Sequence, residues 1–134
     1  MKVTIKIGIF LTVLLLVSYG SWAQKSGGLS ITNTKVSPGT VSPGEKTLIS
    51  CLVSHPLGMM HIGRVAATVF HGNWISTYPI LYDNGTNGDS VPDDGVYSLE
   101  INTPDSAGEA KIVFYAVDRD RNEIKSEPII LTVK

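Results

Sequence analysis

The sequence predicts an all-β fold, a sandwich of about seven antiparallel strands that follows a cleaved signal peptide. Three observations support this expectation. Beyond residue 23, no run of ten or more residues has the apolar spacing of an amphipathic helix. Short runs rich in β-branched and aromatic residues instead alternate with turn-forming Gly, Pro, Asn and Asp. Within these runs apolar and polar residues alternate, so each strand would have one buried and one wet face.

The first 23 residues are expected to be cleaved off and not to be part of the fold. Lys2 and Lys6 flank the start of an apolar run at residues 7–17, and Ser21-Trp22-Ala23 supplies the small-x-small pattern of a cleavage site. The run is short for a bilayer span, which disfavours the alternative of a retained anchor. Residues 1–23 are therefore interpreted as a signal peptide. The protein is expected to be secreted or periplasmic, with no membrane insertion after cleavage.

The mature chain is expected to form one domain without a disulfide. Residues 24–30 are polar and glycine-rich, which predicts a flexible leader, and residues 31–134 form the domain. Cys51 is the only cysteine, so the core must hold by packing alone. Loss of the two N-terminal lysines leaves nine basic and 12 acidic residues. This balance offers no basic face to a nucleic acid or an anionic membrane.

The seven strands are expected at regular intervals along the domain. They are placed near residues 29–36, 45–54, 62–70, 74–82, 95–102, 110–118 and 124–133. The first should kink, because Val-Ser-Pro-Gly occurs at residues 36–39 and again at 41–44, and Pro-Gly favours tight turns. A charged turn at residues 118–122 separates the last two strands. The number and spacing of the strands are typical of an immunoglobulin-like sandwich.

Alternation along each strand predicts which side chains face the core. The expected inward residues are Ile49, Cys51 and Val53; Val65, Ala67 and Val69; Tyr97, Leu99 and Ile101; Ile112, Phe114 and Ala116; and Ile129, Leu131 and Val133. Ser50, Ser98, Glu100 and Lys111 are expected to point outward. An inward Cys51 in apolar surroundings would be an inert thiol and not a nucleophile.

With these strands in place, the chain resembles bacterial immunoglobulin-like and fibronectin-type modules of secreted proteins. The segment LYDNGTNGDSVPDDGVYSLEI, residues 81–101, is similar to an L-x-D-D-G-x-x-G-D-x-x-x-x-D-G-V-Y hairpin of such β-sandwich modules. Asn84 stands where aspartate is commoner, and the second cysteine and core tryptophan of antibody domains are missing. The resemblance implies a disulfide-free module that binds or spaces and does not catalyse.

The aspartate-rich stretch at residues 83–97 offers the strongest candidate site. Counted from Asp83, Asn87, Asp89 and Asp94 fall at positions 5, 7 and 12 of an EF-hand loop, although the match is incomplete. Asp93 adds another carboxylate, and so many acids in one connection repel each other unless a cation or solvent screens them. A weak Ca²⁺ site is one interpretation. A long turn built from residues that favour turns for backbone reasons is the other.

Trp74 and Tyr78 are the candidate binding residues. As exposed aromatic side chains they could stack on a sugar or anchor a protein partner, and as ordinary core or rim residues they would only close one end of the sandwich. His55, His61 and His71 lack the paired spacing of zinc ligands, so they are expected to be solvated loop residues.

No spacing of Ser, Cys, His or acidic residues singles out a catalytic group, so the protein is expected not to be an enzyme. The leading functional interpretation is an exported binding or adhesion module with a protein or carbohydrate partner. The alternative is a purely structural spacer, or an assembly subunit of a surface or periplasmic complex. A small secreted enzyme or inhibitor with unrecognised loop residues is a third possibility.

Overall fold

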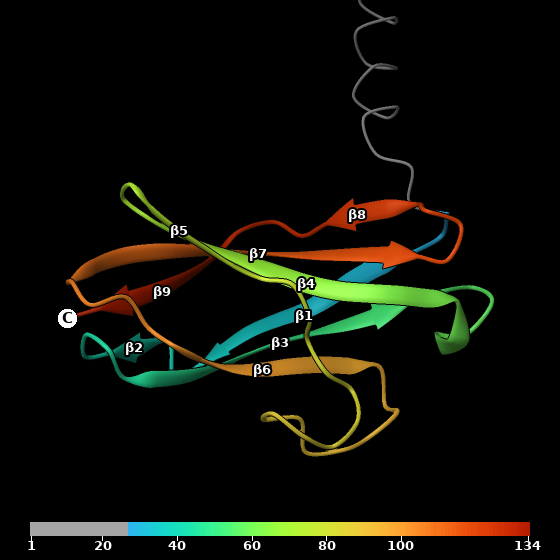
Figure 1. The fold of residues 1–134 in the computed structure, drawn as a ribbon, viewed down its shortest axis with the longest axis horizontal. Coiled ribbons are helices and arrows are strands. Elements are labelled where there is room, and N and C mark those ends of the chain that lie inside the picture. Colours follow the sequence, from blue (N-terminus) through green and yellow to red (C-terminus); the bar gives the residue numbers. More distant parts are fainter. Residues whose placement is uncertain (1–26) are drawn as a thin grey trace, which may run out of the picture.

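The computed structural model describes residues 27–134, and the predicted signal peptide and residues 24–26 lie outside this range. The described residues form nine strands and one short 3₁₀ turn (Figure 1). They are β1 (Ser30–Ser37), β2 (Thr40–Val41), β3 (Lys46–Ser54), η1 (Met59–His61), β4 (Ile62–His71), β5 (Trp74–Tyr78), β6 (Val96–Asn102), β7 (Gly108–Asp118), β8 (Glu123–Lys125) and β9 (Ile129–Val133). Within residues 27–134 there is no helix with the length and apolar character that crossing a bilayer requires.

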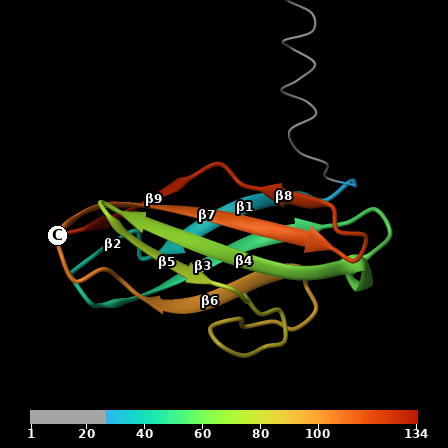
Figure 2. The same ribbon diagram turned by 45° about the horizontal axis from the view of Figure 1, so that its top comes forward.

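The strands form two sheets that pack face to face, so the predicted all-β sandwich is confirmed (Figures 1 and 2). The small sheet has the order β1-β3-β6. The large sheet has the order β2-β9-β7-β4-β5, and β8 pairs with β7 beyond the end of β9. This order corresponds to an immunoglobulin-type sandwich in which the small sheet lacks its fourth strand.

The core lies between the sheets and is built by strand alternation. On β3, β4 and β7 every predicted inward residue is at most 1% exposed. On β9, Leu131 and Val133 are buried as expected, whereas Ile129 is only partly buried. On β6, Ile101 is buried and Tyr97 and Leu99 pack partly buried against the core. Each strand thus places every second side chain in one apolar layer, which supplies the main stabilisation of the fold.

The described residues form nine strands where seven were predicted. The first predicted strand corresponds to β1 in the small sheet, and after a break at residues 38–39 the chain crosses to an additional strand, β2, in the large sheet. There β2 runs parallel to β9, so the expectation of purely antiparallel pairing is wrong for this pair. The last predicted strand is split into β8 and β9, because Ser126 bonds to Phe114 through both its backbone and its hydroxyl and interrupts the ladder.

The predicted strand at residues 74–82 ends earlier, at Tyr78, where Pro79 follows with no N–H for a ladder. The Leu81 N–H still bonds to Val65 of β4, and the chain then leaves the large sheet. Tyr82 reaches the small sheet and exchanges both backbone hydrogen bonds with Ser98 of β6. Residues 83–95 lie beyond β6 in both views (Figures 1 and 2). A side chain at Gly88 would collide with Leu48 of β3, so this loop touches the outer face of the small sheet.

The structure contradicts the prediction that Ser98 faces solvent. Ser98 was expected on a wet face, but it is only 3% exposed. The strand alternation is as predicted, and Tyr82 now lies beside Ser98 at the edge of β6. Glu100 and Lys111 are exposed as expected, and Ser50 is half-buried. Alternation along one strand indicates which face a residue occupies, but a distant loop decides whether that face is wet.

Cys51 should contribute packing and no chemistry. It is fully buried, and burial raises the pKa of its thiol to about 12. Cys51→Ala should lower the free energy of unfolding by about 1–2 kcal/mol through lost packing. Denaturant melts of the two proteins measure this loss. Rapid labelling of the native wild-type thiol by a maleimide would contradict the inert assignment.

Candidate ligand groove and acidic loop

A groove opens at one end of the sandwich because the large sheet extends beyond the small one. Residues paired across two strands share a face, and β5 pairs Tyr78 with Ala67 and Ser76 with Val69, both fully buried. Trp74, Ser76 and Tyr78 therefore occupy the inner face of β5. Beyond this face lies a groove of about 890 Å³, lined by residues 71–74 and 78 on one side and by residues 102–109 on the other.

Both predicted aromatic residues line this groove, and they contribute differently. The Trp74 residue is 43% exposed, so part of its ring is free to contact a ligand. Tyr78 is half-buried and also packs against the core, which holds its ring in place. Trp74 is thus a rim residue, and Tyr78 joins the groove to the core. The structure brings the two together on one strand face, as their spacing of four residues requires.

His71 fixes the shape of the groove by joining its two walls. Its Nδ1 lies 3.2 Å from the Glu109 carbonyl oxygen, and its Nε2 lies 3.0 Å from Ser106 Oγ. The carbonyl can only accept, so in the neutral ring Nδ1–H donates to Glu109 and Nε2 accepts from the Ser106 hydroxyl. The expectation of a solvated loop histidine is therefore wrong for His71, which ties the β4–β5 turn to the β6–β7 connection.

Ser106 and His71 have the separation of a nucleophile and its base, but the third partner differs from that of a catalytic triad. Within residues 27–134, the hydrogen bond at His71 Nδ1 goes to a backbone carbonyl and not to a carboxylate. A neutral carbonyl gives less support to the positive charge that His71 would acquire as a base. We therefore assign this pair a positioning role in the wall of the groove.

The acidic loop brings together three of the five predicted metal residues. Asp83, Asp89 and Asp94 each offer a carboxylate oxygen within 4.8 Å of the others. Asp93 lies outside this group, and it lines a hollow of about 340 Å³ together with Asp83, Met59 and Met60. Asn87 uses its side-chain amide to donate to Thr86 Oγ1. The EF-hand spacing thus predicted part of the cluster, although a β-sandwich supplies neither of the flanking helices.

Backbone N–H groups hold all three carboxylates of this cluster. The donor–acceptor pairs are Gly95 and Asp94 to Asp83, Gly85 to Asp89, and Val96 to Asp94. Asp89 is buried at 5% exposure, so its bond to the Gly85 amide organises the loop from inside. Such side-chain-to-backbone bonds are what aspartates provide in long turns. They leave further carboxylate lone pairs that a hard cation can use.

The carboxyl of Asp83 has a raised pKa within this cluster. Burial raises the pKa of its carboxyl to about 6, against the lowering effect of the Gly95 N–H, and the adjacent Asp94 adds to the rise. A raised value means that the folded loop resists holding Asp83 ionised beside Asp94. Ionising the Asp83 carboxyl beside Asp94 therefore costs free energy in the folded loop.

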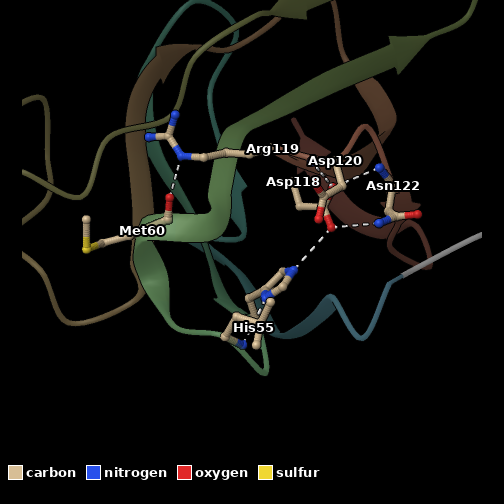
Figure 3. Close-up of polar contacts among 7 residues, drawn as sticks. His55, Met60, Asp118, Arg119, Asp120 and Asn122 are labelled. Atoms are coloured by element: carbon tan, nitrogen blue, oxygen red, sulfur yellow. Dashed lines mark hydrogen bonds and ion pairs between the residues drawn. The ribbon is translucent and has the colours of Figure 1, made fainter.

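Sequence reasoning missed a buried polar cluster at the end of the sandwich where β3 and β7 finish (Figure 3). His55 Nε2 lies 3.1 Å from Asp118 Oδ2, and the two side chains are 3% and 1% exposed. Asp118 also accepts from the backbone of Asp120 and from the backbone and side chain of Asn122. His61 stacks on His55 with ring centroids 5.4 Å apart. The expectation of solvated histidines is therefore wrong for His55 as well.

A signal for this cluster was present in the strand alternation. Continuing the inward row of β3 by two residues from Val53 reaches His55, and continuing that of β7 from Ala116 reaches Asp118. Both polar residues thus fall on inner faces of opposite sheets, at strand ends that meet. A buried carboxylate needs several donors, and a neighbouring histidine and asparagine supply them.

The Asp118 cluster should set the acid limit of stability. The Asn122 side chain, followed by further donors, holds the pKa of Asp118 at about 2, below its ordinary 3.8. The folded state therefore binds fewer protons than the unfolded state between these values, and the contribution of ionised Asp118 is full above pH 3.8 and lost as the pH falls through about 2. Asp118→Asn should melt at a lower temperature than wild type at pH 7, and this gap should close on acidification.

Thermal melts followed by circular dichroism from pH 7 to about 2 measure this effect. Asp120→Asn is the matched control, because Asp120 is exposed and contributes only its backbone N–H to the cluster. A gap between wild type and Asp118→Asn that stays constant with pH would contradict the assigned pKa.

No family model matches the chain, and a search of curated proteins found no match.

Proposed function

We propose that this protein is an exported, non-catalytic binding module of the immunoglobulin-like type, and that its groove beside β5 holds a carbohydrate chain. The observation that carries the proposal is Trp74, an aromatic side chain 43% exposed on the rim of a polar groove. A sugar ring has an apolar face that can lie on an aromatic ring and hydroxyls that need polar partners at its edge. Tyr78 and His71 hold the surrounding walls in place.

The polar lining favours a neutral saccharide. Asp105 and Glu109 are exposed acids in the groove wall, and the lining residues within the described chain include no lysine or arginine. Anionic ligands would meet repulsion without a compensating cation. The amides of Asn73 and Asn102, by contrast, both donate and accept, as sugar hydroxyls do. A protein partner is the alternative for this groove, and it would need a larger apolar contact than one tryptophan provides.

Export is part of the proposal and is supported by the pattern of residues 1–23, in which lysines, an apolar run and Ser21-Trp22-Ala23 follow one another. A module delivered outside the cytoplasm meets cell-wall and environmental glycans. Cleavage after Ala23, which N-terminal sequencing checks, removes Trp22 and leaves Trp74 as the only tryptophan. The intrinsic fluorescence of the mature protein then reports on the groove alone.

The first test is retention of the mature protein in native gels that contain a soluble polysaccharide. Neutral chains such as a β-glucan, a xylan or a mannan should retard the protein and shift the Trp74 fluorescence, whereas alginate should do neither. Trp74→Ala should weaken binding about tenfold or more, because a stacked ring contributes on the order of 1 kcal/mol beyond its buried area. Ile130→Ala is the matched control, since Ile130 is equally exposed, at 43%, on another strand of the same sheet.

Equal migration in all neutral polysaccharides and in plain gels, with unchanged fluorescence, would contradict the carbohydrate proposal. Loss of binding in both Trp74→Ala and Ile130→Ala would show that the groove is not the site.

We also propose that the acidic loop takes one weakly bound Ca²⁺ through Asp83, Asp89 and Asp94. Three hard oxygen ligands within 4.8 Å of one another suit this ion. Extracellular modules bind it with Kd values of about 10⁻⁴–10⁻³ M. The cation would relieve the repulsion between these carboxylates and stiffen the loop against β6. Its role would be structural, because the loop lies beside β6 and supplies no residue to the groove lining.

The second test compares melting temperatures in a few millimolar CaCl₂ and in EDTA. Ca²⁺ should raise the melting temperature of the wild type by a few degrees, as about 1–2 kcal/mol of linked binding energy predicts. Asp94→Asn should abolish the rise while keeping an oxygen to accept the Val96 N–H. Asp93→Asn removes the neighbouring charge, which lies outside the cluster, and should retain the rise. Identical melts of the wild type in CaCl₂ and EDTA would show that the loop is only a turn.

A further inference from the structure

The edge strands of the two sheets are not equally protected against pairing with another chain. β1 carries a register shift between Thr32 and Lys35, with Asn33 at φ 50°, and such bulges blunt an edge. The edge of β6 is covered by Tyr82 and by the Asn87 carbonyl, which accepts from Glu100. β2 and β8 are only two and three residues long. Each of these edges therefore has a feature that discourages a further strand.

β5 has none of these features. It ends the large sheet, and its five residues, Trp-Ile-Ser-Thr-Tyr, include no charge and no proline. Its register with β4 is continuous from the pair His71–Trp74 to the pair Ala67–Tyr78, so it contains no bulge. Ile75 is 62% exposed on its outer face. Among the described strands, β5 is thus the edge best suited to accept another strand.

The register of the hairpin determines which backbone groups point outward. A two-residue turn at Gly72-Asn73, with Gly72 at φ 57°, makes His71 and Trp74 a hydrogen-bonded pair. Hydrogen-bonded pairs alternate along an antiparallel ladder, so Ser76 and Tyr78 also turn their backbones toward β4. The N–H and C=O groups of Ile75 and Thr77 therefore point away from the sheet.

The odd-numbered residues of β4 agree with this assignment. The Leu81 N–H donates to the Val65 carbonyl, on the side of β4 that faces β5. Backbone groups alternate in direction along a strand, so the odd-numbered residues of β4 turn their N–H and C=O groups toward β5 and the even-numbered ones toward β7. The alternation of β4 is therefore fixed independently of the turn. Within residues 27–134, no hydrogen bond outside the β4–β5 ladder engages the backbone N–H or C=O groups of Ile75 or Thr77.

We propose that β5 pairs antiparallel with β5 of a second copy of this chain, about a two-fold axis at Ser76. In this register Ile75 of one copy is opposite Thr77 of the other, and their outward N–H and C=O groups exchange hydrogen bonds on both sides of the axis. Ser76 faces Ser76 as a non-hydrogen-bonded pair. The ladder closes on itself, and Pro79, which has no N–H, ends it in both directions.

The side chains of β5 are also self-complementary in this register. On the inner face Trp74 of one copy lies opposite Tyr78 of the other, and aromatic cross-strand pairs are favourable. On the outer face the exposed Ile75 is opposite Thr77. No like charges meet, because β5 carries no charge. The two grooves then adjoin across the axis, and each gains an aromatic residue from the other copy. The pairing itself does not depend on which ligand the grooves hold.

The experiment measures the mass of the mature protein by sedimentation equilibrium at high micromolar concentration. The wild type is expected to have the mass of a dimer. Thr77→Pro removes one outward N–H and no N–H of the β4 ladder, so it should halve the mass without changing the circular dichroism spectrum. Thr77→Val is the matched control, since it keeps the N–H and should remain dimeric. A monomeric wild type, or a dimeric Thr77→Pro variant, would overturn the proposal.

A cross-linking experiment keeps the proposal testable if Thr77→Pro fails to fold. The Cα atoms of a non-hydrogen-bonded pair are about 4.5 Å apart, within the range a disulfide spans. Ser76→Cys should therefore form a covalent dimer under mild oxidation, whereas Ile130→Cys, exposed on β9, should not. The native Cys51 is fully buried and does not interfere. Equal cross-linking of the two variants, or none by Ser76→Cys, would contradict pairing at β5.

Discussion

The fold depends on one layer of apolar side chains shared between two sheets of unequal width. The middle strand of the small sheet supplies Thr47, Ile49, Cys51 and Val53 to this layer, and β7 of the large sheet supplies Ile112 and Phe114, all fully buried or nearly so. With a single cysteine, no covalent link between the sheets assists this packing. The small sheet can cover only as much of the large one as three strands allow. The inner face of β5 is therefore left to form a groove, and the architecture of the core creates the candidate site.

The alternation of residues made much of this fold predictable from the sequence. Period-two patterns are local, so they identified the inward rows of β3, β4 and β7 without knowledge of which strands pair. Proline and glycine marked the break between β1 and β2. Trp74 and Tyr78 could be predicted to share a face for the same reason, because they are four residues apart on one strand.

Features that join distant segments were beyond local patterns. The sequence did not indicate that Tyr82 would leave the large sheet and bond to Ser98, which is why Ser98 is buried. The groove needs His71 at the end of one connection and Ser106 in another, 35 positions apart. For the acidic loop, the EF-hand spacing identified Asp89 and Asp94, and it also included Asn87, whose side-chain amide donates to Thr86. The path of this loop is set by its bonds to β6. Strand pairing, and not residue spacing, decides such contacts.

The groove and the buried His55–Asp118 pair lie at opposite ends of β7, which begins at Gly108 and finishes at Asp118. A strand of 11 residues spans about 33 Å, and substitutions separated by more than about 10 Å contribute almost independently to stability. The His55–Asp118 pair thus joins the strands at one end of the molecule, while the other end presents the residues that line the groove. Mutations at residues 72–74 or 102–109 leave the contacts of the His55–Asp118 pair unchanged. Successive substitutions in the groove can therefore change ligand specificity while each variant stays folded. Ligand specificity and stability depend on opposite ends of the same strand.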